Sequence, residues 1–336
     1  MNEKSRALVT GGAGFLGGHV GRDLLDLGYE VVALDDLSGG CTENVDPRAD
    51  FVEASILDVP QVEALFEKYR FDYVFHLAAY AAEGLSHFIK RFNYTNNLIG
   101  SVNLINAAIN YEIKCFVFTS SIAVYGENQL PMTEETVPLP EDPYGIAKLA
   151  VESELAVSRR MFGLDFVVFR PHNVYGEYQN LGDPYRNVVG IFMNQIMQGN
   201  SLTVFGDGEQ SRAFTYVRDI SPVIAQAARD ASAYGEVFNI GADEVYTVNQ
   251  LVREVGNAMG VEPQINYLPS RSEVKHAYSD HGKVKTAFGY ETRYSLEAGL
   301  ANMAEWANAS GIRKSQKFDQ IEIEKGLPPS WQALMK

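Results

Sequence analysis

Short apolar runs rich in β-branched residues alternate along the chain with longer segments in which apolar residues recur at helical spacing. The short runs predict buried strands at residues 6–10, 31–35, 51–54, 73–77, 115–120 and 166–170. The longer segments predict helices at residues 15–27, 61–69, 96–110 and 144–161. Such alternation is typical of a parallel sheet with helices on both faces. The sequence therefore predicts an α/β fold with a doubly wound parallel sheet over residues 1–172.

The pattern is looser after residue 172, where Gly- and Asn-rich loops separate shorter elements. It predicts helices at residues 188–198 and 249–259 and a strand at 237–240. We expect the segment near 213–245 to return to the first domain. Residues 173–212 and 246–336 are then expected to form a smaller α/β domain over the carboxyl ends of the strands, where ligands bind in such folds.

A glycine-rich turn joins the first predicted strand to the first predicted helix. Gly11, Gly14 and Gly17 have the spacing that allows a tight turn, close approach of a pyrophosphate and close packing of helix on strand. The second strand ends in Asp35, which is placed to bind a ribose, and Asp36 beside it would also repel a 2′-phosphate. The sequence thus predicts a Rossmann-type domain that binds NAD rather than NADP. The alternative is that Asp35 is an ordinary loop residue.

The composition narrows the possible partners of this 336-residue chain. A formal net charge of −15 argues against binding to nucleic acid or to an anionic membrane surface. Cys41 and Cys115 are the two cysteines, so neither a disulfide framework nor a cysteine metal site is expected. No signal peptide or membrane span is recognised, and a cytoplasmic location is expected.

A tyrosine and a lysine four residues apart begin the helix predicted at 144–161. Tyr144 and Lys148 therefore share one helix face. A nearby ammonium together with a positive nicotinamide lowers the pKa of a phenol, so Tyr144 is a candidate base. Ser120 and Ser121 follow a central strand and could share the proton. The alternatives are a surface Tyr–Lys pair and two serines that cap a turn.

At this point the chain resembles the extended short-chain dehydrogenase/reductase family, and within it the NAD-dependent nucleotide-sugar epimerases of the UDP-galactose 4-epimerase type. The resemblance covers nearly the whole length and rests on a set of motifs: TGGAGFLG, LDDLS, HLAAYAAEG, NNLIGS, TSSIAVYG, YGIAK, RPHNVYG and FGDGEQSRAFTYVRD.

The resemblance implies roles for three sets of residues. It implies a catalytic set of Ser121, Tyr144 and Lys148. It implies cofactor contacts from Gly11, Gly14, Phe15, Leu16, Gly17, Asp35, Asp36, Ser55, Ile56, Leu77, Ala78, Ala79, Ala81, Asn97, Thr119, Tyr144, Lys148 and His172. It implies substrate contacts from Glu83, Ser121, Tyr144, Asn173, Asn187, Val188, Arg212, Arg271 and Ala277, with the arginines on a diphosphate and Ala277 beside the sugar.

By the same resemblance the expected activity is 4-epimerisation of a UDP-hexose through a transient keto intermediate, without a metal. Other enzymes of this scaffold remain open: a decarboxylase, a 2-epimerase or a 4,6-dehydratase. Ile122 and Ala123 stand where the dehydratases carry an Asp–Glu pair. A catalytically silent NAD-binding sensor is a further alternative, although such proteins usually lose the Tyr–Lys pair.

The resemblance also implies a homodimer, formed through helices 96–110 and 144–161. These segments carry apolar residues beyond what one sheet contact needs, among them Leu98, Val102, Ile105, Leu149 and Leu155.

Overall fold

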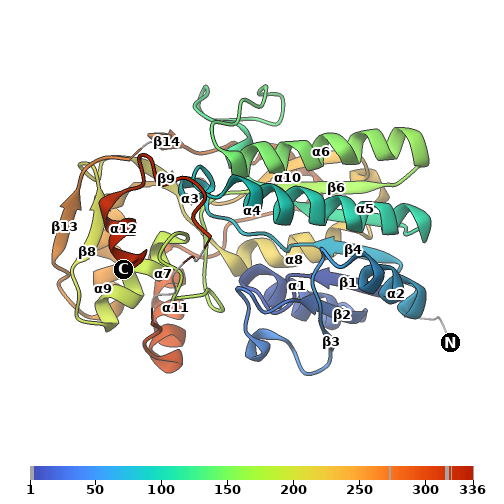
Figure 1. The fold of residues 1–336 in the computed structure, drawn as a ribbon, viewed down its shortest axis with the longest axis horizontal. Coiled ribbons are helices and arrows are strands. Elements are labelled where there is room, and N and C mark those ends of the chain that lie inside the picture. Colours follow the sequence, from blue (N-terminus) through green and yellow to red (C-terminus); the bar gives the residue numbers. More distant parts are fainter. Residues whose placement is uncertain (1–3, 272–273, 315–317, 319, 336) are drawn as a thin grey trace.

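A seven-stranded parallel sheet forms the centre of the protein, whose computed structural model describes residues 4–271, 274–314, 318 and 320–335. The strand order is β11-β6-β5-β4-β1-β2-β3 (Figure 1). The strands are β1 (Arg6–Thr10), β2 (Glu30–Asp35), β3 (Asp50–Glu53), β4 (Tyr73–His76), β5 (Cys115–Thr119), β6 (Phe166–Pro171) and β11 (Glu236–Ile240). The predicted doubly wound fold is confirmed. Its order reverses between β1 and β4, the position where ligands bind in such sheets.

Helices cover both faces of this sheet. One face carries α1 (Phe15–Asp26) and α8 (Val217–Ala227), and the other carries α2 (Val59–Tyr69), α5 (Gly100–Asn110) and α6 (Pro143–Phe162). Successive residues of a strand point to opposite faces. Val9 therefore shares a buried cluster with Val20 of α1, while Leu8 shares one with Phe66 of α2. We call the sheet with α1–α6 and α8 the sheet region.

Three short sheets form a smaller region, which we call the small-sheet region (Figure 1, left). Its strands are β7 (Val174–Tyr175), β8 (Leu202–Phe205), β9 (Ser211–Ala213), β10 (Thr215–Tyr216), β12 (Val245–Thr247), β13 (Ile265–Leu268) and β14 (His276–Ala277). Its helices are α7 (Val188–Met197), α9 (Val248–Met259) and α11 (Leu296–Ser310). Phe192, Leu251 and Met303 belong to its own buried core.

The remaining helices are short. They are α3 (Glu83–Ser86), α4 (Lys90–Tyr94), α10 (Gly282–Phe288) and α12 (Pro329–Met335), and a π-helical segment (Thr95–Ile99) joins α4 to α5. Short 3-10 turns lie at Thr42–Asn44, Ile122–Val124 and Ala231–Ala233. Within the described ranges, no helix combines the length and apolar character needed to cross a membrane.

The start of α6 is set by its own sequence. Asp142 caps the helix by accepting a hydrogen bond from the Gly145 N–H at 2.9 Å, and Pro143 has no N–H to satisfy at the first position. The cap places Tyr144 in the first turn, beside the end of β5.

Candidate active site

One large cavity, of about 510 Å³, lies over the carboxyl ends of the parallel strands and extends to the small-sheet region. Residues that follow β1, β2, β4, β5 and β6 line it on the sheet side, and residues of α7, β8 and β9 line it on the other. This is where an open parallel sheet is expected to hold its ligand.

The glycine turn after β1 forms part of the cavity wall. Gly11 has a φ of +68°, and a Cβ there would lie 2.9 Å from the Ala78 Cα. A Cβ on Gly17 would lie 2.0 Å from the Gly11 carbonyl oxygen. No side chain caps the N-terminus of α1 at Gly14. The turn therefore offers a bare helix N-terminus and a close backbone approach, which suit the pyrophosphate of a dinucleotide.

Asp35 lies at the end of β2 and also lines the cavity. Its carboxylate accepts hydrogen bonds from the Leu37 N–H at 2.8 Å and the Ala13 N–H at 3.1 Å, which fix its orientation. Burial raises its pKa above the ordinary value, and these N–H groups oppose that rise. Asp35 is thus a firmly held acceptor, as ribose hydroxyls require.

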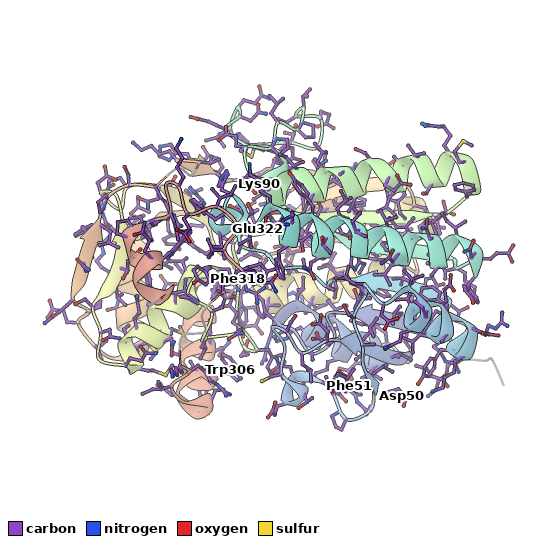
Figure 2. All side chains as sticks on the ribbon, viewed as in Figure 1. Asp50, Phe51, Lys90, Trp306, Phe318 and Glu322 are labelled. Carbon is purple, nitrogen blue, oxygen red and sulfur yellow. The ribbon has the colours of Figure 1, made fainter. Side chains whose placement is uncertain are left out.

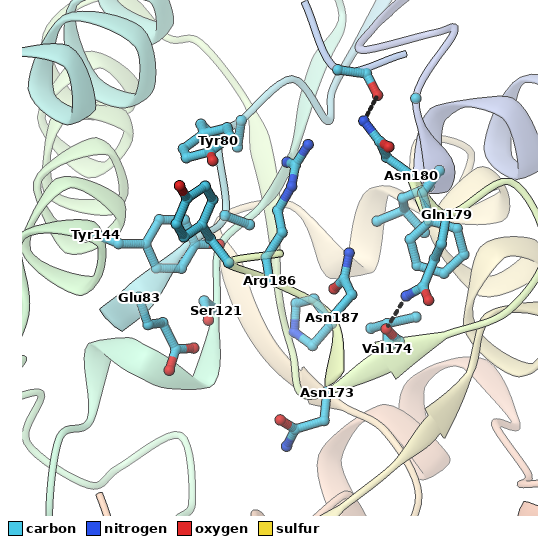
Figure 3. A pocket seen from close by; sticks show the side chains of 18 of the residues that line it. Tyr80, Glu83, Ser121, Tyr144, Asn173, Val174, Gln179, Asn180, Arg186 and Asn187 are labelled. Carbon is cyan, nitrogen blue, oxygen red and sulfur yellow. Dashed lines mark hydrogen bonds between the residues drawn. The ribbon is translucent and has the colours of Figure 1, made fainter. Parts of the chain in front are cut away.

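Ser121, Tyr144 and Lys148 meet where β5 ends against the first turns of α6. The Lys148 Nζ donates to the Thr119 carbonyl oxygen at 2.8 Å and lies 5.8 Å from the Tyr144 ring centroid. The Ser121 Oγ accepts from the Ala123 N–H at 3.1 Å, which fixes it at the start of a 3-10 turn. Figure 3 shows Ser121, Tyr144 and Glu83 at one side of the cavity.

Burial shifts the pKa values of both Tyr144 and Lys148. Burial raises the pKa of Tyr144, the charge of Glu83 raises it further, and a hydrogen bond with Ser121 opposes the rise. Burial lowers the pKa of Lys148 to about 7, although Glu152 raises it. The predicted lowering of the Tyr144 pKa depends on a positively charged nicotinamide as well as on Lys148, so it stays a prediction. The protein's own residues enclose the phenol, and the lysine donates to a carbonyl oxygen.

The substrate-side residues named from the sequence all line the cavity, except Ala277. Asn173 and Asn187 both have positive φ, of 42° and 60°, which asparagine tolerates better than most residues. The Arg212 guanidinium donates to the carbonyl oxygens of Ser211 and Lys275, at 2.8 and 2.9 Å. Two arginines, Arg212 and Arg271, thus stand on the wall opposite the sheet.

Four named residues lie behind the cavity lining rather than on it. The Ser55 Oγ accepts from the Leu57 N–H at 3.3 Å, and Ile56 alone of that pair reaches the cavity. Ala277 belongs to an apolar cluster with Tyr125 and Met132, and Val274 lines the cavity in its place. Ser55, two residues beyond the end of β3, and Ala277, the last residue of β14, thus lie outside the lining, and the contacts expected of them stay predictions.

Asn97 and His172 lie behind the lining, and Asn97 contacts it through Tyr80. The Asn97 side chain accepts from the Tyr80 N–H at 2.8 Å and donates to the Tyr80 carbonyl oxygen at 3.0 Å, so it holds the strand-end loop that lines the cavity. His172 lies 2.9 Å from the His281 Nε2, and burial lowers its pKa to about 3. Neither is among the residues that line the cavity, and the cofactor contacts expected of them stay predictions.

Sequence reasoning missed Tyr185 and Arg186, which both line the cavity, as does Tyr80. The Arg186 Nε donates to Asp183 at 2.7 Å, and its guanidinium carbon lies 4.7 Å from the Tyr80 ring centroid. Figure 3 shows Arg186 extended between the Tyr144 side and the Asn187 side. Arg186 directly precedes Asn187 in the segment DPYRNVV, and this proximity to a predicted substrate residue could have identified it.

The fold and the cavity define a dinucleotide-binding enzyme of the dehydrogenase type. A family model described as "NAD dependent epimerase/dehydratase family" matches residues 7–241. The chain belongs to this family, and it is an NAD-dependent enzyme.

Individual relatives agree with this assignment. The UDP-glucose 4-epimerase of Thermotoga maritima, solved with UDP-glucose, is 38% identical, with 91% of this chain and 99% of that chain covered and a TM-score of 0.85. The Thermus thermophilus UDP-glucose 4-epimerase, solved with NAD, is 32% identical, with 90% and 98% covered and a TM-score of 0.84. A putative UDP-glucose 4-epimerase of Methanocaldococcus jannaschii is 34% identical, with 89% and 97% covered. Each match leaves about a tenth of this chain uncovered while spanning nearly all of the relative.

Proposed function

We propose that the protein interconverts UDP-hexoses that differ in configuration at carbon 4, with NAD held between the glycine turn and Asp35. The observation that carries the proposal is a single cavity with a buried tyrosine–serine pair at the sheet end and two arginines at the far end. An acid–base group suits proton exchange with a sugar hydroxyl, and guanidinium groups suit a diphosphate. The named relatives act on UDP-glucose, which favours UDP as the nucleotide.

In this proposal the chain's own residues move a proton while NAD supplies reversible hydride acceptance. Tyr144 takes the proton of the sugar hydroxyl, with Ser121 within hydrogen-bonding reach of the phenol. Asn173 and Asn187 line the space between the tyrosine and the arginines, where the sugar would turn to present its other face. Arg212 and Arg271 hold the diphosphate during that turn. Tyr144 then returns the proton, and because the hydride that NAD accepted would also be returned, the overall reaction is redox-neutral.

The residues after Ser121 bear on the alternatives. Ile122 and Val124 are buried in an apolar cluster, so this turn presents no carboxyl group to the cavity. Elimination of water needs an acid and a base at this place. We therefore favour epimerisation over 4,6-dehydration.

A substrate panel tests the proposal. The purified protein is incubated with UDP-glucose, UDP-N-acetylglucosamine, UDP-glucuronate, dTDP-glucose and GDP-mannose, and products are identified by NMR. We expect a UDP-sugar to be converted to its 4-epimer without added NADH. Release of carbon dioxide, inversion at carbon 2, or absence of turnover for every UDP-sugar would reject it.

We also propose a division into domains and a homodimer. The proposed domains are residues 1–172 with the segment near 213–245, and residues 173–212 with 246–336.

The proposed dimer uses the outer faces of α5 and α6, which lie side by side (Figure 1). Ile105 and Leu155, two residues named for the interface, are instead buried in the chain's own core. Exposed apolar side chains on or next to these helices support the proposal: Ile99, Ile146, Val157, Met161 and Phe162. A monomeric mass by light scattering at micromolar concentration would reject the dimer.

A further inference from the structure

The described residues after α11, at 311–314, 318 and 320–335, form a segment that we call the tail, which ends in α12 (Figure 1, red). It first leaves the small-sheet region at Arg313. The Arg313 N–H donates to the Asn194 side chain at 3.1 Å, and the Asn194 and Gln198 amides donate to the Arg313 carbonyl oxygen at 3.0 and 2.9 Å. The tail therefore begins from a fixed point on α7.

The middle of the tail is fastened to α4 of the sheet region. The Glu322 carboxylate accepts from the N–H groups of Arg91 and Phe92, both at 2.9 Å. The Glu322 N–H donates to the Phe88 carbonyl oxygen at 2.8 Å. The Phe318 ring, labelled with Glu322 in Figure 2, packs against Phe92. The centroids of the two rings are 4.8 Å apart. These contacts bring the tail from one region to the other.

The end of the tail places Trp331 directly behind the cavity wall. The Trp331 side chain is 4% exposed, and its ring meets the Tyr185 ring edge-on at a centroid distance of 5.5 Å. A Cβ on Gly84 would lie 3.3 Å from the Trp331 Cη2. Tyr185 and Gly84 both line the cavity, whereas Trp331 stands behind them. Trp331 thus contacts the lining without facing the ligand space.

Trp331 also contributes to the surroundings of Arg271. The Arg271 guanidinium carbon lies 4.6 Å from the Phe205 ring centroid and 5.9 Å from the Trp331 ring centroid. Arginine loses considerable rotamer entropy when it is fixed, and aromatic faces attract its planar cation. Two rings from distant parts of the chain, the end of β8 and the tail, therefore restrict one guanidinium at the cavity wall.

From these contacts we infer that Trp331 is a positioning residue for the diphosphate end of the cavity, where it holds Arg271 and Tyr185 in their binding orientation. This inference rests on the proposed function, because it assigns Arg271 to the diphosphate. The tail is then a part of the substrate site rather than an inert extension. Trp331 acts through Arg271, so it affects binding more than the chemical step.

Binding and turnover of the full-length, NAD-loaded protein test the inference. UDP, dTDP, GDP and CDP are each titrated by calorimetry, and kcat and KM are measured with the best sugar substrate. We expect Trp331→Leu, which keeps an apolar side chain but removes the ring, to raise the Kd of UDP and the KM about tenfold. We expect kcat to stay within twofold, and Trp331→Phe to recover most of the affinity.

The second tryptophan of the chain supplies the matched control. Trp306 packs edge-on against Tyr178, outside the cavity lining, at a centroid distance of 6.3 Å. Trp306→Phe should leave both constants unchanged and leave Trp331 as the one tryptophan, whose emission should shift as UDP saturates the site. In Trp331→Phe the remaining Trp306 should give no shift.

Two results overturn the inference: a UDP Kd within twofold of the parent value in folded Trp331→Leu, or a parent protein that binds none of the four nucleotides. If Trp331→Leu does not fold, an unchanged Trp331 emission in Trp306→Phe at saturating UDP overturns it. Failure of the proposed function gives a different result, namely UDP binding that depends on Trp331 without epimerisation of any UDP-sugar.

Discussion

The sheet region and the small-sheet region present their cavity residues in different ways. In the sheet region, the lining includes many small residues just after the strand ends, as at Gly11, Ala78 and Ser121. In the small-sheet region, the lining consists mainly of long side chains such as Arg212 and Arg271, held by carbonyl groups and rings from distant segments. A site built from strand ends follows directly from the fold. A site built from long side chains also needs other residues, often distant in the sequence, to hold each side chain in place.

Tyr144→Phe tests the sheet region most strongly. The change removes the proposed base and keeps the ring, so kcat should fall about 10²- to 10⁴-fold, equivalent to about 2.7–5.5 kcal/mol. UDP affinity should change little, since the arginines are untouched. Tyr69→Phe in α2, whose hydroxyl contacts Lys68 far from the cavity, is the control and should be silent. Retention of half the parent kcat would contradict the assignment.

Gly17→Ala tests whether the backbone of the glycine turn is the decisive element. Its Cβ would lie 2.0 Å from the Gly11 oxygen, so the turn must shift, and we expect loss of bound NAD and about 1–3 kcal/mol of unfolding free energy. Gly21 lies on the same helix, and a Cβ added there would meet no atom of the described residues within 4 Å, apart from its chain neighbours and the backbone of its own helix. Gly21→Ala should therefore stabilise the protein by about 0.5–1 kcal/mol. Both are measured by urea unfolding and by the NAD content after purification. Equal NAD content in the two variants would speak against a role for the tight turn.

The buried Lys148 should make the free energy of unfolding depend on pH. Its pKa is about 7 in the folded protein, against an ordinary value of about 10.4, so the unfolded state binds more protons between these values. The free energy of unfolding should therefore rise with pH from 7 to 10, by at most about 1.4 kcal/mol per pH unit from this group. Below pH 7 both states hold the proton and this contribution is flat. Lys148→Met should abolish this rise of the unfolding free energy with pH. Lys68→Met, at an exposed position, should retain it. Equal slopes in both variants would count against the burial argument.

Thr247→Ala gives the smallest effect and probes the small-sheet region. The Thr247 Oγ1 accepts from the Gln250 N–H at 3.1 Å, and the Gln250 side chain accepts from the Thr247 N–H at 2.7 Å, a capping box at the start of α9. Loss of the cap should cost about 1 kcal/mol of unfolding free energy, and Thr247→Ser should retain it. NAD content and kcat should stay unchanged, because the cap lies outside the cavity lining. A drop in NAD content would show that the two regions are coupled.

The same contrast explains what could be predicted from the sequence. Alternating apolar runs and the glycine spacing identified the sheet, the turn and Asp35, because each depends on residues close together in the chain. The positions of Ala277 and His172 did not follow from their motifs, since the direction of a side chain at the end of a strand depends on what packs behind it. Trp331 could not be linked to Arg271, because 60 residues separate them and no periodic pattern connects them.

The strand order also has a consequence for the way the chain is made. β6 ends at Pro171, but its outer neighbour β11 begins at Glu236, and the 64 residues between them fold largely elsewhere. At about 5–20 residues per second, a ribosome needs about 3–13 seconds to make that stretch. During this interval the backbone groups of β6 form an open sheet edge, which can pair with another strand. The nascent protein is therefore most prone to aggregate after its cofactor-binding turn is complete and before its sheet is closed.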